Sequence, residues 1–202
     1  MRASPETVRT MHMSILVATA ILISVLVHSD TGLSQEMSKP QIIEATARGT
    51  STQMGQIVQV RLIINEYSTE EDRQILIDAF QKGRNQGLVN ALEKMRAVGR
   101  IAITGTLGYD VSYTRSIPTP TGRKIRFITN RLLRFGETYY STRTADYNLT
   151  AGELTLNEAD KNKSTGVLYP AARLRLDKND ELSLDLNRNP WELVSIIDWG
   201  AK

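Results

Sequence analysis

The chain has 202 residues, 25 Lys and Arg against 22 Asp and Glu, a formal net charge of +3, and no cysteine. The lack of cysteine excludes disulfides and thiolate chemistry. Its two histidines, His12 and His28, both lie near the N-terminus. If that segment is removed, the remaining chain cannot form a Ser-His-Asp or Cys-His catalytic site, nor a zinc site built from histidine or cysteine.

An uncharged apolar segment occupies residues 14–27 and follows two arginines. A basic start, a short apolar run and then small residues are typical of a secretory signal peptide, whereas a membrane-spanning helix needs about 20 apolar residues. We predict a signal peptide over residues 1–34, cleaved after Ser29 or, by preference, after Ser34. A permanent membrane anchor is the alternative. The prediction places an exported protein in the periplasm or outside the cell, with no membrane span after cleavage.

The chain after this leader divides into two parts. Residues 35–53 are polar and show no clear period, which predicts a flexible arm. No repeat or linker follows, so we expect a single α+β domain over residues 54–200. This domain opens with a strand at residues 56–67, where apolar and polar side chains alternate.

Helical spacing replaces the alternation after this strand. Ser68 and Glu71 have the spacing of a capping box, which predicts the start of a helix that ends at Gly83. Apolar residues recur at helical spacing again between Gly87 and Gly99. We therefore expect two short helices, each packed on the sheet by one apolar face.

Residues 101–113 alternate strictly, which predicts one long strand, bent or bulged at Gly105 and Gly108. Residues 116–123 are expected to form the loop of the following hairpin. In that hairpin, we expect Arg115 to lie near Arg123 and Val111 to face Phe127 on the core side.

The last third of the domain continues as strands. The apolar parity of residues 142–157 changes at Ala151 and Gly152, which predicts a bulge. Residues 168–176 form the next strand, in which Pro170 indicates an edge or bulge position.

A hairpin is expected to follow, and its short loop fixes the register: Leu176 opposite Leu182, Leu174 opposite Leu184, and Arg173 opposite Asp185. The segment at residues 189–199 has features of both a helix start and a strand, and we favour the strand. Together these elements predict one strongly curved, mostly antiparallel sheet of about 6–7 strands, with the two helices between the first and second strands.

A basic strip is the strongest candidate site. Alternation on residues 123–136 places four polar side chains on one face, Lys124, Arg126, Asn130 and Arg134. They belong to a segment in which Glu137 is the single acid among seven basic residues, Arg115, Arg123, Lys124, Arg126, Arg131, Arg134 and Arg143.

Arginine suits phosphate and carboxylate groups, so the strip is expected to contact an anionic lipid or glycan of the cell envelope. The alternative is a solvated face that acids on neighbouring strands neutralise, and pairing of Arg126 and Arg134 with acids would refute the binding strip. Nucleic acid is not expected as a partner of an exported protein with so small a net charge.

Carboxylate chemistry is the main catalytic alternative. Four acids lie near the long strands, Asp110, Glu137, Asp146 and Glu153. A pair of them about 5–9 Å apart could hydrolyse a glycosidic bond, although no spacing in the sequence requires such a pair. The acidic turn at residues 177–181 lacks the glycine and the distal glutamate of a calcium loop, so we expect no metal and no cofactor.

Several strings, including "TGTLGYDVSYTR", "PTPTGRKIRFITNR", "STGVLYPAARLRLD" and "NPWELVSIIDW", resemble a group of uncharacterised exported bacterial proteins over residues 56–199. The resemblance implies export and a shared fold, and implies no activity. We expect a non-enzymatic exported binding protein. The alternatives are a carboxylate-based hydrolase of envelope glycans and a structural component of an envelope assembly, joined through an exposed edge near Pro170.

Overall fold

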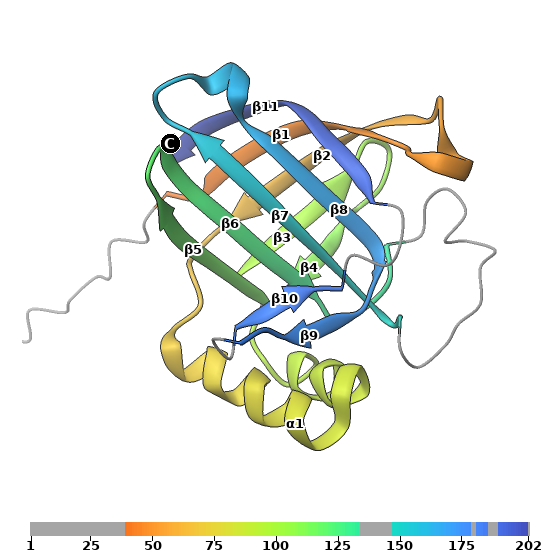
Figure 1. Cartoon of the computed structure of the whole chain (residues 1–202), viewed down its shortest axis with the longest axis vertical. Helices are drawn as coiled ribbons and strands as arrows, with labels where there is room; N and C mark the ends of the chain where they lie inside the picture. The colour runs from red at the N-terminus through yellow and green to blue at the C-terminus, as the bar shows by residue number, and fades with distance from the viewer. Residues whose placement is uncertain (1–38, 134–146, 179–180, 186–189, 202) are drawn as a thin grey trace, which may run out of the picture. The chain divides into compact units, whose positions relative to one another are not determined.

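The computed structural model describes residues 39–133, 147–178, 181–185 and 190–201. These residues form one domain, in which a nine-stranded antiparallel sheet curves into a nearly closed barrel and one helix packs on its outside (Figure 1). The elements in chain order are β1 Gln41–Arg48, η1 Ser51–Gln53, β2 Ile57–Ile64, α1 Glu70–Leu92, β3 Gly99–Ile103, β4 Tyr109–Val111, β5 Tyr113–Thr119, β6 Gly122–Thr129, β7 Leu149–Asn157, η3 Lys161–Lys163, β8 Thr165–Ala172, β9 Leu174–Leu176, β10 Leu182–Leu184 and β11 Trp191–Ala201.

The order of the strands in the sheet is β4-β3-β2-β1-β11-β8-β7-β6-β5, so the first strand pairs with the last. β4 and β5 follow each other through Ser112, whose backbone N–H donates to the Ile128 carbonyl at 3.1 Å. One bent segment therefore pairs with β3 through its first part and with β6 through its second. This bend brings the two edges of the sheet together and nearly closes the barrel.

Two apolar clusters stabilise the domain. The first fills the barrel with alternate side chains from the strands, as in β1, where Ile43, Ala45 and Ala47 are buried and their neighbours are partly exposed. The second lies on the outer face of β5 to β8, beneath α1 and the β9–β10 hairpin. α1 and the hairpin thus cover one side of the barrel, and the candidate site lies there.

The predicted strand at residues 56–67 is confirmed as β2, and the tail is confirmed as the strand β11. The predicted hairpin register is also confirmed, with Leu176 opposite Leu182 and Leu174 opposite Leu184. The bulge predicted at Ala151 and Gly152 is wrong, because β7 keeps an unbroken register with β6 and the extra residue in the β7–β8 ladder lies on β8. The apolar parity changes because the start of β7 packs in the second cluster and its later residues Leu154 and Leu156 pack in the first.

The predicted flexible arm at residues 35–53 is wrong for its described part. Residues 41–48 form β1, a central strand between β2 and β11. Because β1 adds a strand at the start, the helix lies between the second and third strands rather than between the first and second. The sheet has nine strands instead of 6–7 for this reason and because the long strand predicted at residues 101–113 is divided.

That division occurs at Gly105 and Gly108, whose φ angles are +86° and +81°. Few residues other than glycine adopt such angles readily, so the chain reverses here and β3 pairs with β4. Leu107, placed in the core by its parity, is 91% exposed at the tip of this turn. The prediction of a single bent strand is therefore wrong.

The β5–β6 hairpin also has a different register. Thr119 pairs with Gly122 across a two-residue turn, so Arg115 lies opposite Arg126, not near Arg123, and Phe127 lies opposite Thr114, not Val111. The strands continue further into the proline-containing segment than its composition indicates.

The predicted pair of helices is one helical element with a break. Gly83 and Arg84 have non-helical angles, and the helix resumes directly after them instead of after Gly87. Its capping box is one residue later than predicted, with Thr69 and Asp72 in place of Ser68 and Glu71. The Ser68 hydroxyl instead accepts a hydrogen bond from the Thr114 backbone N–H at 3.1 Å, which ties the helix start to β5.

Pro170 lies in β8, between β7 and β11 in the sheet, and is buried. Thr150 is the β7 residue opposite the bulge that contains Pro170, and its hydroxyl donates to the Pro170 carbonyl at 2.6 Å. The bulge prediction for this proline is confirmed, and the exposed edge proposed for an envelope scaffold is not found there.

Candidate functional site

Two basic residues of the predicted strip, Lys124 and Arg126, form ion pairs with one acid. Lys124 and Arg126 project from β6 toward Glu153 of β7, at 2.8 Å and 2.7 Å respectively. Burial opposes ionisation of Glu153, but hydrogen bonds from the two cations outweigh it and hold the pKa of Glu153 below its ordinary value. This pairing agrees with the alternative to a binding strip, in which an acid on a neighbouring strand pairs with the basic face of the sheet.

Asn130, a further residue of the predicted strip, is not among the residues that line the pocket described next. The Asn130 side-chain oxygen accepts a hydrogen bond from Arg131 Nε at 3.1 Å. Arg134 lies outside the described residues. Of the strip residues that the structure describes, Arg126 alone lines the pocket described next.

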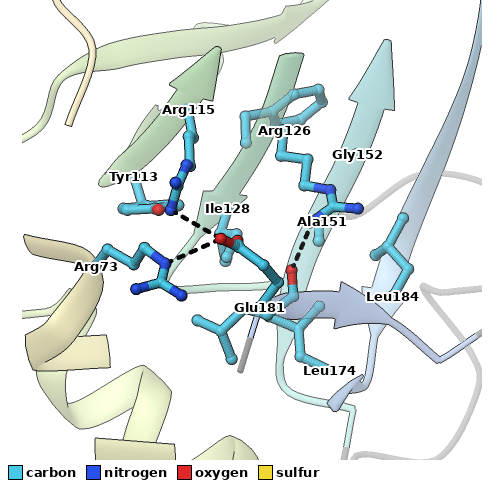
Figure 2. Close-up of a pocket in the computed structure, with 12 residues that line it drawn as sticks. Arg73, Tyr113, Arg115, Arg126, Ile128, Ala151, Gly152, Leu174, Glu181 and Leu184 are labelled. Carbon is cyan, nitrogen blue, oxygen red and sulfur yellow. Dashed lines mark hydrogen bonds and ion pairs between the residues drawn. The ribbon is translucent and has the colours of Figure 1, made fainter. Parts of the chain in front are cut away.

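That pocket, here called the arginine pocket, lies between the outer face of the barrel, α1 and the β9–β10 hairpin (Figure 2). Its polar side chains are Arg73 from α1, Tyr113 and Arg115 from β5, Arg126 from β6, and Glu181 just before β10. Its floor is apolar, with Phe127, Ile128, Ala151, Leu174 and Leu182 among the lining residues.

Glu181 lies between two of these arginines, as Figure 2 shows. Its Oε1 atom is 3.2 Å from Arg73 Nε and 3.3 Å from Arg115 Nη1. The Arg115 Nη1 atom is buried and makes no hydrogen bond of acceptable geometry. The carboxylate is therefore close enough to form ion pairs with both guanidinium groups, but it does not satisfy the Arg115 donor.

Further contacts surround this group. Arg73 Nη1 lies 2.6 Å from Glu70, and Arg126 Nη1 donates to the Leu182 carbonyl at 3.2 Å. Burial lowers the pKa of Arg73, but Glu70 and Glu181 outweigh it, so the pKa is raised overall. The Arg73–Glu181 ion pair joins the hairpin to α1, and the Arg126–Leu182 hydrogen bond joins the hairpin to the barrel.

The arginines and the tyrosine of the pocket are hydrogen-bond donors that are poorly suited to proton transfer. Guanidinium groups keep their protons at physiological pH. Burial raises the pKa of the Tyr113 hydroxyl, against the opposing effect of Arg115, so the phenol stays neutral. The free volume is about 20 Å³, which is room for a water molecule but not for an organic ligand.

The two described carboxylates among those proposed for catalysis, Asp110 and Glu153, do not lie on neighbouring strands. Asp110 lies on β4 opposite Arg100, and Glu153 lies on β7, which is not a neighbour of β4 in the sheet. Glu137 and Asp146 lie outside the described residues.

A second pair of acids, not anticipated from the sequence, lines a pocket of about 130 Å³ near η3 and β11. It contains the exposed Glu158 and also Asp198, which accepts hydrogen bonds from Gln41 and Arg123 at 2.8 Å each.

Sequence reasoning missed Arg73 and Glu181. Their contact joins α1 to a hairpin that follows much later in the chain, and no motif spacing connects the two residues. The nearest signal was the confirmed hairpin register, which placed Glu181 directly beside β10.

No protein-family model, curated protein or solved structure matches this chain. Within the described ranges, no cluster of three or more His, Asp or Glu residues is arranged to hold a metal ion. None of the helices in these ranges has the length and apolar character needed to cross a membrane.

Proposed function

We propose that the protein is a non-enzymatic exported binding protein whose ligand is an amphiphilic anion, such as an anionic lipid, held in the arginine pocket. The anionic group would lie between Arg73 and Arg115, where the Glu181 carboxylate now lies. The apolar part would cover the floor formed by residues such as Ile128 and Leu174.

The buried Arg115 Nη1 atom is the main support for this proposal. A buried donor without a hydrogen bond is unfavourable by about 1–3 kcal/mol, more when it is charged. A ligand carboxylate or phosphate is not attached to the hairpin and can align with the planar guanidinium group. Such a ligand can therefore form the hydrogen bond to Arg115 Nη1 that Glu181 does not form. Glu181 lies 3.3 Å away, but without hydrogen-bond geometry.

The small free volume means that Glu181 must move when the ligand binds. Its side chain is 27% exposed, so it has a path to solvent without unfolding of the hairpin. Glu181 then acts as a competitor within the protein, and its removal should strengthen binding.

Isothermal titration of the purified full chain with laurate, below its micelle concentration, tests the proposal. Glu181→Gln should bind laurate about tenfold more tightly than the wild type, because the competing charge is gone. Arg115→Gln should weaken binding by about the same factor. The matched control is Arg100→Gln, which removes one exposed positive charge on β3 and should leave binding unchanged.

All four proteins share residues 1–38, so differences between them do not arise from the apolar N-terminal segment. The proposal would be refuted if neither the wild type nor Glu181→Gln bound laurate. That result would show that the arginines serve only to attach the hairpin.

Export is a separate part of the proposal and rests on the N-terminal pattern. N-terminal sequencing of the protein from its host should find Gln35, or Asp30, as the first residue. Recovery of intact Met1 would contradict export by this leader.

The glycan hydrolase is a less supported alternative. The pocket with Glu158 and Asp198 favours it, but Asp198 already binds Gln41, Arg123 and the Gly200 backbone, which identifies it as a structural acceptor. Release of reducing sugar from envelope glycans, abolished in Asp198→Asn, would support the hydrolase.

A further inference from the structure

A polar groove of about 300 Å³ lies where α1 meets the segment between β8 and β9. Its lining includes three arginines, Arg84 from α1 and Arg173 and Arg175 from the β8–β9 region. None of the three lines the arginine pocket, although Leu174 contributes to both. We call this feature the kink groove.

The break in α1 places Arg84 at the groove. Arg84 has φ +51° and ψ −142°, a conformation that is close to one adopted almost only by glycine. Such strain in a non-glycine residue persists only where the surroundings enforce it, and it is concentrated at functional sites. The preceding residue is Gly83, so a glycine is present in the break but not at the position that has the strained backbone angles.

The other side of the groove is held by Asn85, which is 2% exposed. Its side-chain nitrogen donates to the Ala172 carbonyl, and its side-chain oxygen accepts from the Leu174 backbone N–H, each at 3.0 Å. These bonds hold the backbone on both sides of Arg173. One residue therefore fixes the helix break and the arginine-bearing segment relative to each other.

Among the described residues that line the kink groove, three are positively charged and one is negatively charged. Asp185 is the acid among the lining residues and lies 3.6 Å from Arg173. Within the part of the chain that the structure describes, neither Arg84 nor Arg175 makes an ion pair. The Arg84 guanidinium lies 5.4 Å from the centre of the Phe80 ring, which limits the freedom of the side chain without neutralising its charge.

We propose that the kink groove is a second anion site, specific for a phosphate group. Three guanidinium groups around a polar hollow provide a set of donors suited to the oxygens of a phosphate, and each can bind two of them. The phosphate can belong to a soluble phosphate ester or to a lipid headgroup. This inference does not depend on the arginine pocket.

Titration of the full chain with inorganic phosphate at low ionic strength tests the site. Arg84→Gly is the decisive variant, because it removes the cation and also relieves the backbone strain. Phosphate binding should weaken by about tenfold or more, while the midpoint of thermal unfolding should rise. Loss of binding in a more stable protein cannot be attributed to unfolding.

Arg175→Gln should weaken phosphate binding without raising the midpoint, and the control Arg100→Gln should change neither. Laurate binding should be the same in Arg84→Gly as in the wild type, which separates this site from the arginine pocket. Phosphate binding that is absent from the wild type, or unchanged in Arg84→Gly, would overturn the inference.

Sedimentation with vesicles distinguishes the two sources of phosphate. If phosphatidylglycerol vesicles bind the wild type more strongly than Arg84→Gly, and phosphatidylcholine vesicles show no such difference, the phosphate belongs to an anionic lipid headgroup. If the two proteins bind both kinds of vesicle equally but differ in binding inorganic phosphate, the ligand is a soluble phosphate ester.

Discussion

Replacement of Gly152 by alanine should destabilise the domain by overpacking. A Cβ atom at this position would lie 2.3 Å from Phe127 Cζ and 2.5 Å from Cε1. Carbon atoms pack at about 3.5–4.0 Å, so the ring would have to move by about 1 Å or more. Phe127 is only 1% exposed and pairs directly with Gly152 across the β6–β7 ladder, so little space is free for this movement.

Such overpacking costs about 1–3 kcal/mol, and the smaller entropy of the unfolded alanine chain offsets about 0.4–1 kcal/mol of it. We therefore expect Gly152→Ala to lower the free energy of unfolding by about 1–2 kcal/mol. For a domain of this size, that corresponds to a fall of about 2–8 °C in Tm. Urea titration and thermal unfolding, followed by circular dichroism, measure the two quantities.

A double-mutant cycle with Phe127→Leu attributes the effect to this contact. Leucine removes the ring atoms that the new methyl group would meet, so Gly152→Ala should cost less in the Phe127→Leu background. Equal costs in both backgrounds, or a Gly152→Ala protein as stable as the wild type, would refute the packing of Phe127 against Gly152.

Three further predictions concern the bonds that hold the site. The wild type should be more stable than Glu153→Gln above pH 4.5, the ordinary glutamate pKa, and this difference should be lost as the pH falls through the lowered pKa of the native carboxylate. Urea titrations from pH 7 to 3 measure the difference in free energy of unfolding. A difference that does not change with pH would show that Lys124 and Arg126 do not bind this residue. Asn85→Ala should lower the free energy of unfolding by about 1–3 kcal/mol, because it leaves two buried backbone groups without partners, and a neutral result in urea would contradict that anchor. Thr69→Ala should cost about 0.5–2 kcal/mol through loss of the helix cap, and no change in the urea midpoint would exclude this residue as the cap.

Local pattern predicted those elements whose pairing is also local. The β9–β10 hairpin was predicted to the residue, because a short loop leaves one register that pairs leucine with leucine. The strand β1 was missed, because two of its three buried core positions are the small residues Ala45 and Ala47 and its burial depends on the distant strands β2 and β11. Leu107 had the parity of a core residue, but the backbone angles of the two nearby glycines direct it to solvent.

The candidate site was predictable only in its chemistry. The basic character of β6 predicted an anion-binding strip, and one residue of that strip, Arg126, lines the arginine pocket. The acid that pairs with Lys124 and Arg126 lies on the next strand, and its position opposite Arg126 depends on a register that the sequence did not specify. The contact between Arg73 and Glu181 depends on how α1 packs against the hairpin, which is a property of the tertiary structure alone.

A crystal structure of the protein with laurate would test the central claim most directly. We expect the laurate carboxylate between Arg73 and Arg115, with Arg115 Nη1 donating a hydrogen bond to it and the Glu181 side chain turned toward solvent. A structure in which Glu181 keeps both ion pairs while laurate lies elsewhere on the protein would contradict the account.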